Sequence, residues 1–193
     1  MKHLKENRIL KEEALTALKG KWGLAILTFV IFMSISMLSS RALFVFGFLI
    51  SAPLAVGFRM FYLSLSRGET PHIVSLFKYF NNRFGTYLWA YVVMIIRVIL
   101  WSLLLIVPGI IAAISYSQTF FVLAEDDSVS ALEAIDKSKH MMSGHKWKYF
   151  KLILSFIGWA ILCIFTIGIG FLWLCVYMSV TKAKFYDELK VIH

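Results

Sequence analysis

Charged residues are scarce in this sequence. Lysine, arginine, aspartate and glutamate make up 16% of its 193 residues, and hydrophobic residues make up 60%, whereas a typical soluble domain is about 25% charged and about half apolar. This composition excludes an ordinary soluble domain, and it also excludes a disordered chain, which would be poor in apolar residues. The two cysteines are too few for a disulfide scaffold. The composition therefore predicts an integral membrane protein.

Acidic residues are absent from the long apolar segments, which are residues 22–38, 42–65, 87–107, 110–124 and 149–181. A helix needs about 20 apolar residues to cross a bilayer, and the last segment is long enough for two spans divided at residues 167–170. We therefore predict an all-α, polytopic membrane helix bundle with six transmembrane helices in three hairpins. The short fourth to sixth spans are also compatible with re-entrant segments.

Two sequence features mark the expected turns between these spans. Ser39-Ser40-Arg41 interrupts the first long apolar stretch, and Pro108-Gly109 combines a helix-ending proline with a permissive glycine. The absence of an acid in the spans also argues against a proton- or cation-coupled transporter, because such proteins usually carry one.

The net charge of +9 indicates how the chain crosses the membrane. Seventeen of the 20 lysines and arginines lie before, between or after the predicted hairpins, and Arg41 is the one basic residue in a turn within a hairpin. Short loops rich in lysine and arginine remain in the cytoplasm. We therefore predict a multi-pass protein of the cell membrane with both termini cytoplasmic. Basic residues interleaved with spans do not indicate nucleic-acid binding.

A similar segment precedes each predicted hairpin. An amphipathic stretch, with the spacing of a capping box at Ser130 and Glu133 in its third occurrence, is followed by a basic residue and then an aromatic one. The aromatic residues Trp22, Phe84 and Trp147 are 62 and 63 residues apart. We expect these three to anchor the chain at the membrane interface. The spacing predicts a single membrane domain, residues 1–193, with a threefold internal repeat (1–68, 69–127 and 128–193). The alternative is that any cytoplasmic loop gathers basic and aromatic residues.

Five basic residues are candidates for binding anions or anionic lipid: Arg59, Arg97, Lys21, Arg83 and Lys146. Arg97 lies near the middle of the predicted third span, where a charge costs a few kcal/mol. It either binds an anion inside the bundle or is satisfied by backbone carbonyls, serines or a tyrosine. Arg59 is near the cytoplasmic end of its span, so its side chain can extend to the interface. The other three belong to the predicted interfacial segments.

The sequence contains no recognisable catalytic, nucleotide-binding or metal-binding motif, so we expect neither an enzyme nor a cofactor. The triplet Glu125-Asp126-Asp127 can in principle bind a divalent cation, but consecutive carboxylates more often cap the helix that follows. The histidines do not have the spacing of a two-histidine metal site.

Several segments resemble a known family. The segments include Pro53-Leu54-Ala55-Val56-Gly57-Phe58-Arg59, Leu65-Ser66-Arg67-Gly68-Glu69, Val107-Pro108-Gly109-Ile110-Ile111, Gly144-His145-Lys146-Trp147 and Thr166-Ile167-Gly168-Ile169-Gly170. In this order, from about residue 8 to 189, they resemble the bacterial integral membrane family catalogued as domain of unknown function 975. That family is distantly similar to the membrane domain of some glycerophosphodiester phosphodiesterases. The resemblance implies a bacterial plasma-membrane protein and no particular activity. Arg97 stands where it implies an apolar residue.

Two functions fit these observations. The first is a non-enzymatic membrane protein that acts as a binding or accessory module at the cytoplasmic leaflet and engages anionic lipid, a membrane-protein partner or a second copy of itself. The second is a small transporter or lipid-handling protein that holds an anionic ligand between its hairpins. A cavity that reaches Arg59 or Arg97 would favour the second.

Overall fold

All regular elements of the protein are helices in the residues that the computed structural model describes, which are 4–42, 44–80, 83–166 and 168–192. One of them, η1, is a 3-10 helix. In chain order they are α1 (Asn7–Leu18), α2 (Trp22–Ala42), α3 (Phe44–Ser66), η1 (Ile73–Phe80), α4 (Phe84–Leu104), α5 (Ile106–Ser115), α6 (Thr119–Glu125), α7 (Ala131–Met141), α8 (Lys146–Leu154), α9 (Ile157–Phe165) and α10 (Gly170–Ile192).

Three helical stretches are long and apolar enough to cross a membrane. They are Phe84–Leu103, Val107–Glu125 and Lys146–Phe165, and a fourth is added if α1 and the first part of α2, which meet at a bend of 97°, count as one. Large apolar side chains are exposed on these stretches, such as Leu103 at 83% and Phe165 at 81%. Such exposure is costly in water and is expected where lipid surrounds the helix.

Both turns expected at Ser39-Ser40-Arg41 and at Pro108-Gly109 are wrong, because helix continues through these residues in the structure. Helix α2 continues through Ser39-Ser40-Arg41 to Ala42, because three polar residues in a row do not interrupt helical hydrogen bonding. The break after α4 lies at Leu105, whose backbone is extended, with φ −166° and ψ 146°. Pro108 instead occupies the first turn of α5, where its missing N–H costs nothing. It therefore marks the start of a helix and not the turn before it.

The break predicted at residues 167–170 is confirmed, although residue 167 itself lies outside the described residues. Helix α9 ends at Phe165 and α10 begins at Gly170. Gly168 has φ +82°, a left-handed conformation that glycine adopts without a steric penalty. The capping box is also confirmed, since Ser130 and Glu133 each bond the other's backbone N–H at the start of α7.

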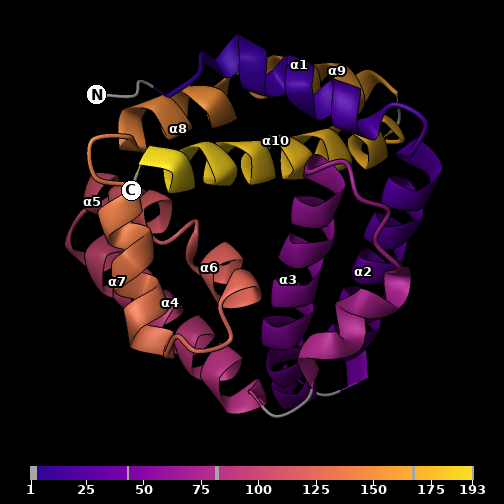
Figure 1. Ribbon diagram of the computed structural model, residues 1–193. Coiled ribbons are helices and arrows are strands. Elements are labelled where there is room, and N and C mark those ends of the chain that lie inside the picture. The colour runs from indigo at the N-terminus through magenta and orange to yellow at the C-terminus, as the bar shows by residue number, and fades with distance from the viewer. Residues whose placement is uncertain (1–3, 43, 81–82, 167, 193) are drawn as a thin grey trace.

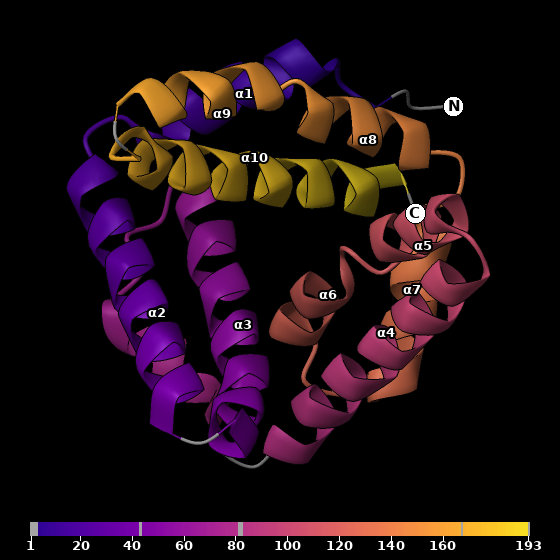
Figure 2. The same ribbon diagram turned by 180° about the vertical axis from the view of Figure 1, so that it is seen from behind.

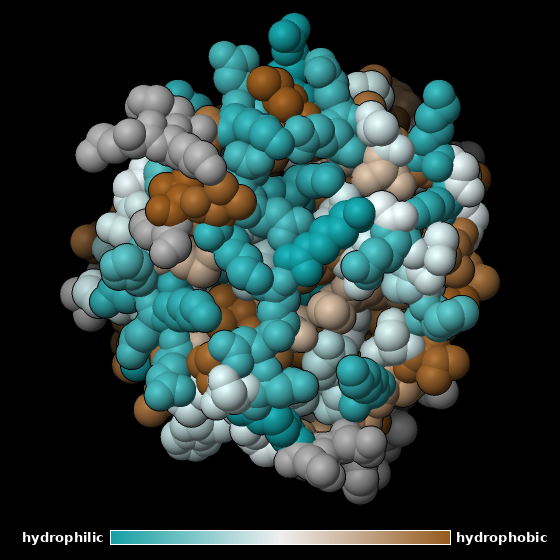
Figure 3. Space-filling model, in the orientation of Figure 1, coloured by the Kyte–Doolittle hydropathy of each residue, from teal (hydrophilic) through white to brown (hydrophobic). Residues whose placement is uncertain are grey.

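The sides of a triangle are formed by α2 with α3, by α4 and α5 with α6, and by α8 and α9 with α10, and helices α3, α6 and α10 lie on the inside (Figures 1 and 2). The short helices α1, η1 and α7 all lie on the face turned toward the viewer in Figure 1. Helix η1 packs on α3, α7 packs on α6, and α1 packs on α10. Each of these short helices therefore contacts one of the inner helices. Hydrophilic residues dominate this same face (Figure 3), which we call the polar face.

Candidate functional site

Charged residues from the inner helices meet in one ion cluster on the polar side. Arg67, directly after α3, pairs with Glu125 at the end of α6 and, at 2.6 Å, with Asp187 of α10. Glu125 also accepts hydrogen bonds from Tyr186 Oη at 2.7 Å and Lys190 Nζ at 2.9 Å. Glu125 of the acidic triplet thus forms an ion pair that links α6 to the end of α3. In the described part of the chain, no three histidine, cysteine, aspartate or glutamate side chains are placed to hold a metal ion.

Two of the predicted anion-binding residues hold neighbouring loops. Lys21 Nζ donates to the carbonyls of Gly68 at 2.5 Å and Glu69 at 2.7 Å, just after α3. Arg83 donates to the carbonyl of Val129 at 2.5 Å, in the loop after α6. Their charged groups are therefore engaged by backbone oxygens, and these two residues act in loop positioning.

Lys146 belongs to a different environment, which we call the basic cleft. This cleft has a volume of about 260 Å³ and lies between α4, α5, α7 and α8. Lys139 and Lys146 make no ion pair or hydrogen bond with any described residue, so two unpaired cations line it. The remaining lining residues are Trp101, Pro108, Ile111, Ala112, Ser115 and Tyr116.

Arg97 lies against one wall of the basic cleft without lining it. Its guanidinium carbon is 5.9 Å from the centre of the Tyr116 ring, and its Nη1 is 3.8 Å from Asp136 Oδ1 on α7. The span itself offers no acid, but the short helix α7 supplies one across the helix interface. Asp136 is 71% exposed, so solvent screens this ion pair and leaves it weak.

Arg59 lies among the inner helices. Its guanidinium carbon is 5.1 Å from the centre of the Phe121 ring of α6, and the residue is partly buried. Lys182 lies on α10, a helix that packs against α3, and it is also partly buried.

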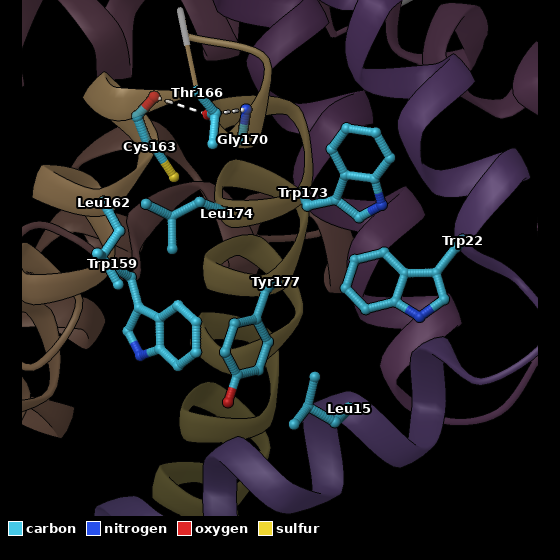
Figure 4. A pocket seen from close by; sticks show the side chains of 10 residues that line it. All are labelled: Leu15, Trp22, Trp159, Leu162, Cys163, Thr166, Gly170, Trp173, Leu174 and Tyr177. Atoms are coloured by element: carbon cyan, nitrogen blue, oxygen red, sulfur yellow. Dashed lines mark hydrogen bonds between the residues drawn. The ribbon is translucent and has the colours of Figure 1, made fainter.

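An apolar groove runs between α1, α2, α9 and α10, with a volume of about 430 Å³ (Figure 4). Trp22, expected to anchor the interface, lines it together with Trp159, Trp173 and Tyr177. No charged side chain lines this groove; its other lining residues are Leu15, Leu162, Cys163, Thr166, Gly170 and Leu174.

The two other expected anchors differ from each other in exposure. Phe84 is partly buried at the start of α4. Trp147 is 65% exposed and stacks on Phe150, with ring centres 5.4 Å apart. An exposed, stacked indole at the start of a long apolar stretch has the geometry expected of an interface anchor.

A family model described as "Protein of unknown function (DUF975)" matches residues 92–192, slightly more than half of the chain. No curated protein and no solved structure matches the chain. The distant similarity to the membrane domain of glycerophosphodiester phosphodiesterases therefore stays a prediction.

Proposed function

This chain belongs to the DUF975 family of proteins of unknown function, as its sequence motifs predict, and from the geometry of its sites we propose that it is a non-enzymatic membrane protein that binds an anionic lipid. The basic cleft carries this proposal. Its two lysines come from α7 and the start of α8, and its other lining residues, most of them apolar, come from α4, α5 and the residue after α5. An anionic lipid has the same division between headgroup and acyl chain.

The energies support a lipid in preference to a soluble anion. Each lysine near a membrane surface contributes about 1 kcal/mol toward an anionic headgroup. Trp101 and Ile111, which are 49% and 46% exposed, offer apolar surface for the acyl chain, and burying such surface is worth about 25 cal/mol per Å². A soluble anion would gain only the first of these contributions.

Comparison with Lys21 and Arg83 supports a ligand-binding role for Lys146. All three precede an aromatic residue at the start of a long apolar helix. Lys21 and Arg83 donate hydrogen bonds to carbonyls of a neighbouring loop. Lys146 makes no such contact within the described residues and lines the cleft. Its charge remains available to a headgroup.

In the membrane, we propose six spans in three hairpins, with both termini in the cytoplasm and three related units around the triangle. The three long apolar stretches are three of these spans, and helices α2, α3 and α10 are the other three. The position of 17 of the 20 lysines and arginines before, between or after the predicted hairpins supports this placement. A non-enzymatic role is supported by Ser115, whose hydroxyl donates to the Ile111 carbonyl at 2.7 Å and is not directed at a base.

Fluorescence quenching tests lipid binding at the cleft. Detergent-solubilised protein is titrated with phosphatidylglycerol carrying brominated chains, which quench nearby tryptophan, and Trp101→Phe identifies the signal from the cleft. Removing two charges with Lys139→Gln and Lys146→Gln costs about 2 kcal/mol and therefore weakens binding about 30-fold.

The matched control is the pair Lys19→Gln and Lys78→Gln, which removes the same charge from exposed positions outside the cleft. It should leave the affinity unchanged. Equal losses in both double variants would refute a specific site and leave only general attraction to anionic surfaces. Quenching that is unchanged by Trp101→Phe would place the lipid elsewhere.

A lipid-handling or transport activity is the second candidate. One observation favours it: the cleft reaches Tyr116, against which Arg97 packs within a predicted span. Reconstituted vesicles containing a fluorescent anionic lipid in one leaflet would reveal it, because a handling protein equilibrates the two leaflets faster than empty vesicles do. A rate equal to that of empty vesicles would reject this candidate and leave the binding role intact.

A further inference from the structure

The apolar groove is a concave site whose walls come from four helices (Figure 4). Leu15 of α1 and Trp22 of α2 form one side of it, and Trp159 of α9 forms the other. Its volume of about 430 Å³ falls within the range of roughly 300–1,000 Å³ that is typical of ligand sites. Cys163 and Leu174, which also line it, are only 8% and 6% exposed. The groove is therefore a site that can enclose part of a ligand, and not a flat helix surface.

The hydroxyl groups that line the groove are held by bonds within the protein. The Tyr177 hydroxyl donates to the Lys11 carbonyl at 3.3 Å, which ties α10 to α1. The Thr166 hydroxyl donates to the Cys163 carbonyl at 2.8 Å and accepts from the Gly170 N–H at 3.0 Å (Figure 4). These bonds fix the walls, so the groove is formed before any ligand arrives.

Three hydrogen-bond donors of the groove have no acceptor. The indole N–H groups of Trp22, Trp159 and Trp173 donate to no other residue in the described part of the chain. An indole N–H can only donate, and tryptophans that are buried or lie at a membrane interface usually find a partner for it. A ligand with hydrogen-bond acceptors therefore supplies what these three side chains lack.

The groove offers no positive charge to a ligand. No charged side chain belongs to its lining among the described residues. Lys11, whose carbonyl bonds Tyr177, directs its Nζ elsewhere, since this atom donates to the Ser155 carbonyl at 3.4 Å and lies 4.5 Å from the centre of the Phe156 ring. Lys21 is held by loop carbonyls. Because a buried charge needs a partner, the groove favours an uncharged ligand.

The groove is open to the bilayer along α9. Trp159 and Leu162 line it and are each 57% exposed. Both belong to Lys146–Phe165, one of the stretches that are long and apolar enough to cross a membrane. The hydrocarbon that surrounds this stretch therefore reaches the groove, and a ligand enters from the lipid and not from water.

We propose that the apolar groove binds one uncharged lipid of the diacylglycerol class. One hydrocarbon chain lies along the apolar lining, and the ester carbonyls of the lipid accept hydrogen bonds from the tryptophan N–H groups. The proposal does not rest on lipid binding at the basic cleft, because the two sites share no lining residue. They also favour opposite headgroups, since one offers lysines and the other offers donors without charge.

The test uses the full-length protein in nanodiscs of phosphatidylcholine and a diacylglycerol that carries a photoreactive diazirine on one chain. Mass spectrometry locates the labelled peptides after illumination, and unlabelled dioleoylglycerol is added as a competitor. Labelling is expected on α9, on α10 and between Leu15 and Trp22, and dioleoylglycerol should displace the probe at lower amounts than phosphatidylglycerol does. Trp159→Phe and Trp173→Phe each remove one donor and keep an aromatic ring, so each should weaken the affinity for dioleoylglycerol about fivefold.

Trp89→Phe is the matched control, because Trp89 is also 57% exposed but lies on α4, outside the groove. It should bind dioleoylglycerol as the wild type does, and so should the double variant Lys139→Gln with Lys146→Gln. Leu162→Trp provides a second test that leaves the donors in place. It adds bulk at an exposed position of the lining and should reduce the labelling of α10.

Three outcomes would overturn the proposal. Labelling spread over α4 and α5 as strongly as over α9 would show only general contact with lipid. Equal affinities of Trp89→Phe, Trp159→Phe and Trp173→Phe for dioleoylglycerol would exclude the tryptophan donors. Equal displacement by phosphatidylglycerol and dioleoylglycerol would exclude a preference for an uncharged lipid.

Discussion

Replacing Glu125 with glutamine should destabilise the protein more than any other single change in the ion cluster. Its carboxylate, 11% exposed, accepts from Arg67, Tyr186 and Lys190. A hydrogen bond to a charged group contributes about 1.5–3 kcal/mol when shielded, whereas an exposed ion pair contributes about 0.5 kcal/mol. The amide of glutamine keeps one acceptor, so we expect a loss of about 2–3 kcal/mol in the free energy of unfolding.

Substitutions of two partners of Glu125 should each lower the free energy of unfolding by less than Glu125→Gln does. Tyr186 is 2% exposed, and Tyr186→Phe removes one buried hydrogen bond, which costs about 1 kcal/mol. Lys190 is 57% exposed, and Lys190→Met should cost about 0.5 kcal/mol or less. Urea unfolding in detergent micelles, followed by the fluorescence of the six tryptophans, measures all three on one scale.

Glu69→Gln is the control, because Glu69 is an exposed acid near the same loop and its removal changes the net charge equally. The reasoning is refuted if Glu125→Gln and Glu69→Gln are equally stable. It also fails if Lys190→Met is as damaging as Glu125→Gln. A double-mutant cycle with Arg67→Gln isolates the coupling between α3 and α6, expected at about 1–2 kcal/mol.

Two further changes have expected outcomes. Gly57→Ala places a methyl group against the Leu76 carbonyl and should cost about 1–3 kcal/mol of unfolding free energy, while Gly23→Ala, which meets nothing, should be neutral or slightly stabilising. Ser130→Ala removes half of the capping box and should cost about 1 kcal/mol, with faster hydrogen exchange confined to the start of α7.

Periodic features of the sequence translate directly into the fold. Leu10, Ala14 and Leu18 recur at helical spacing and are all buried in α1. Gly168 was readable as a break because its conformational freedom is a property of the residue itself. The proline at 108 was misread because its tolerance in a first helical turn looks, in sequence alone, like a turn signal.

Contacts between residues of different helices could not be predicted from the sequence. Nothing near Arg97 in the sequence indicates that Asp136 will lie 3.8 Å away. Lys21 and Lys146 have the same local context, yet one bonds two carbonyls and the other lines a cleft. These roles are set by tertiary contacts, which local patterns do not encode.

The contact of α1 with α10 has a consequence for how the chain reaches its final state during synthesis. Leu10, Ala14 and Leu18 are buried on α1, which packs on both α3 and α10, so their apolar faces are fully covered only after α10 has been made. The ion pair between Lys5 Nζ and Glu188 Oε1 of α10, 2.8 Å apart, likewise forms only after α10 has been made. Helix α1 is therefore made well before its docking is complete, and substitutions in α1 should speed unfolding while leaving the rate of folding almost unchanged.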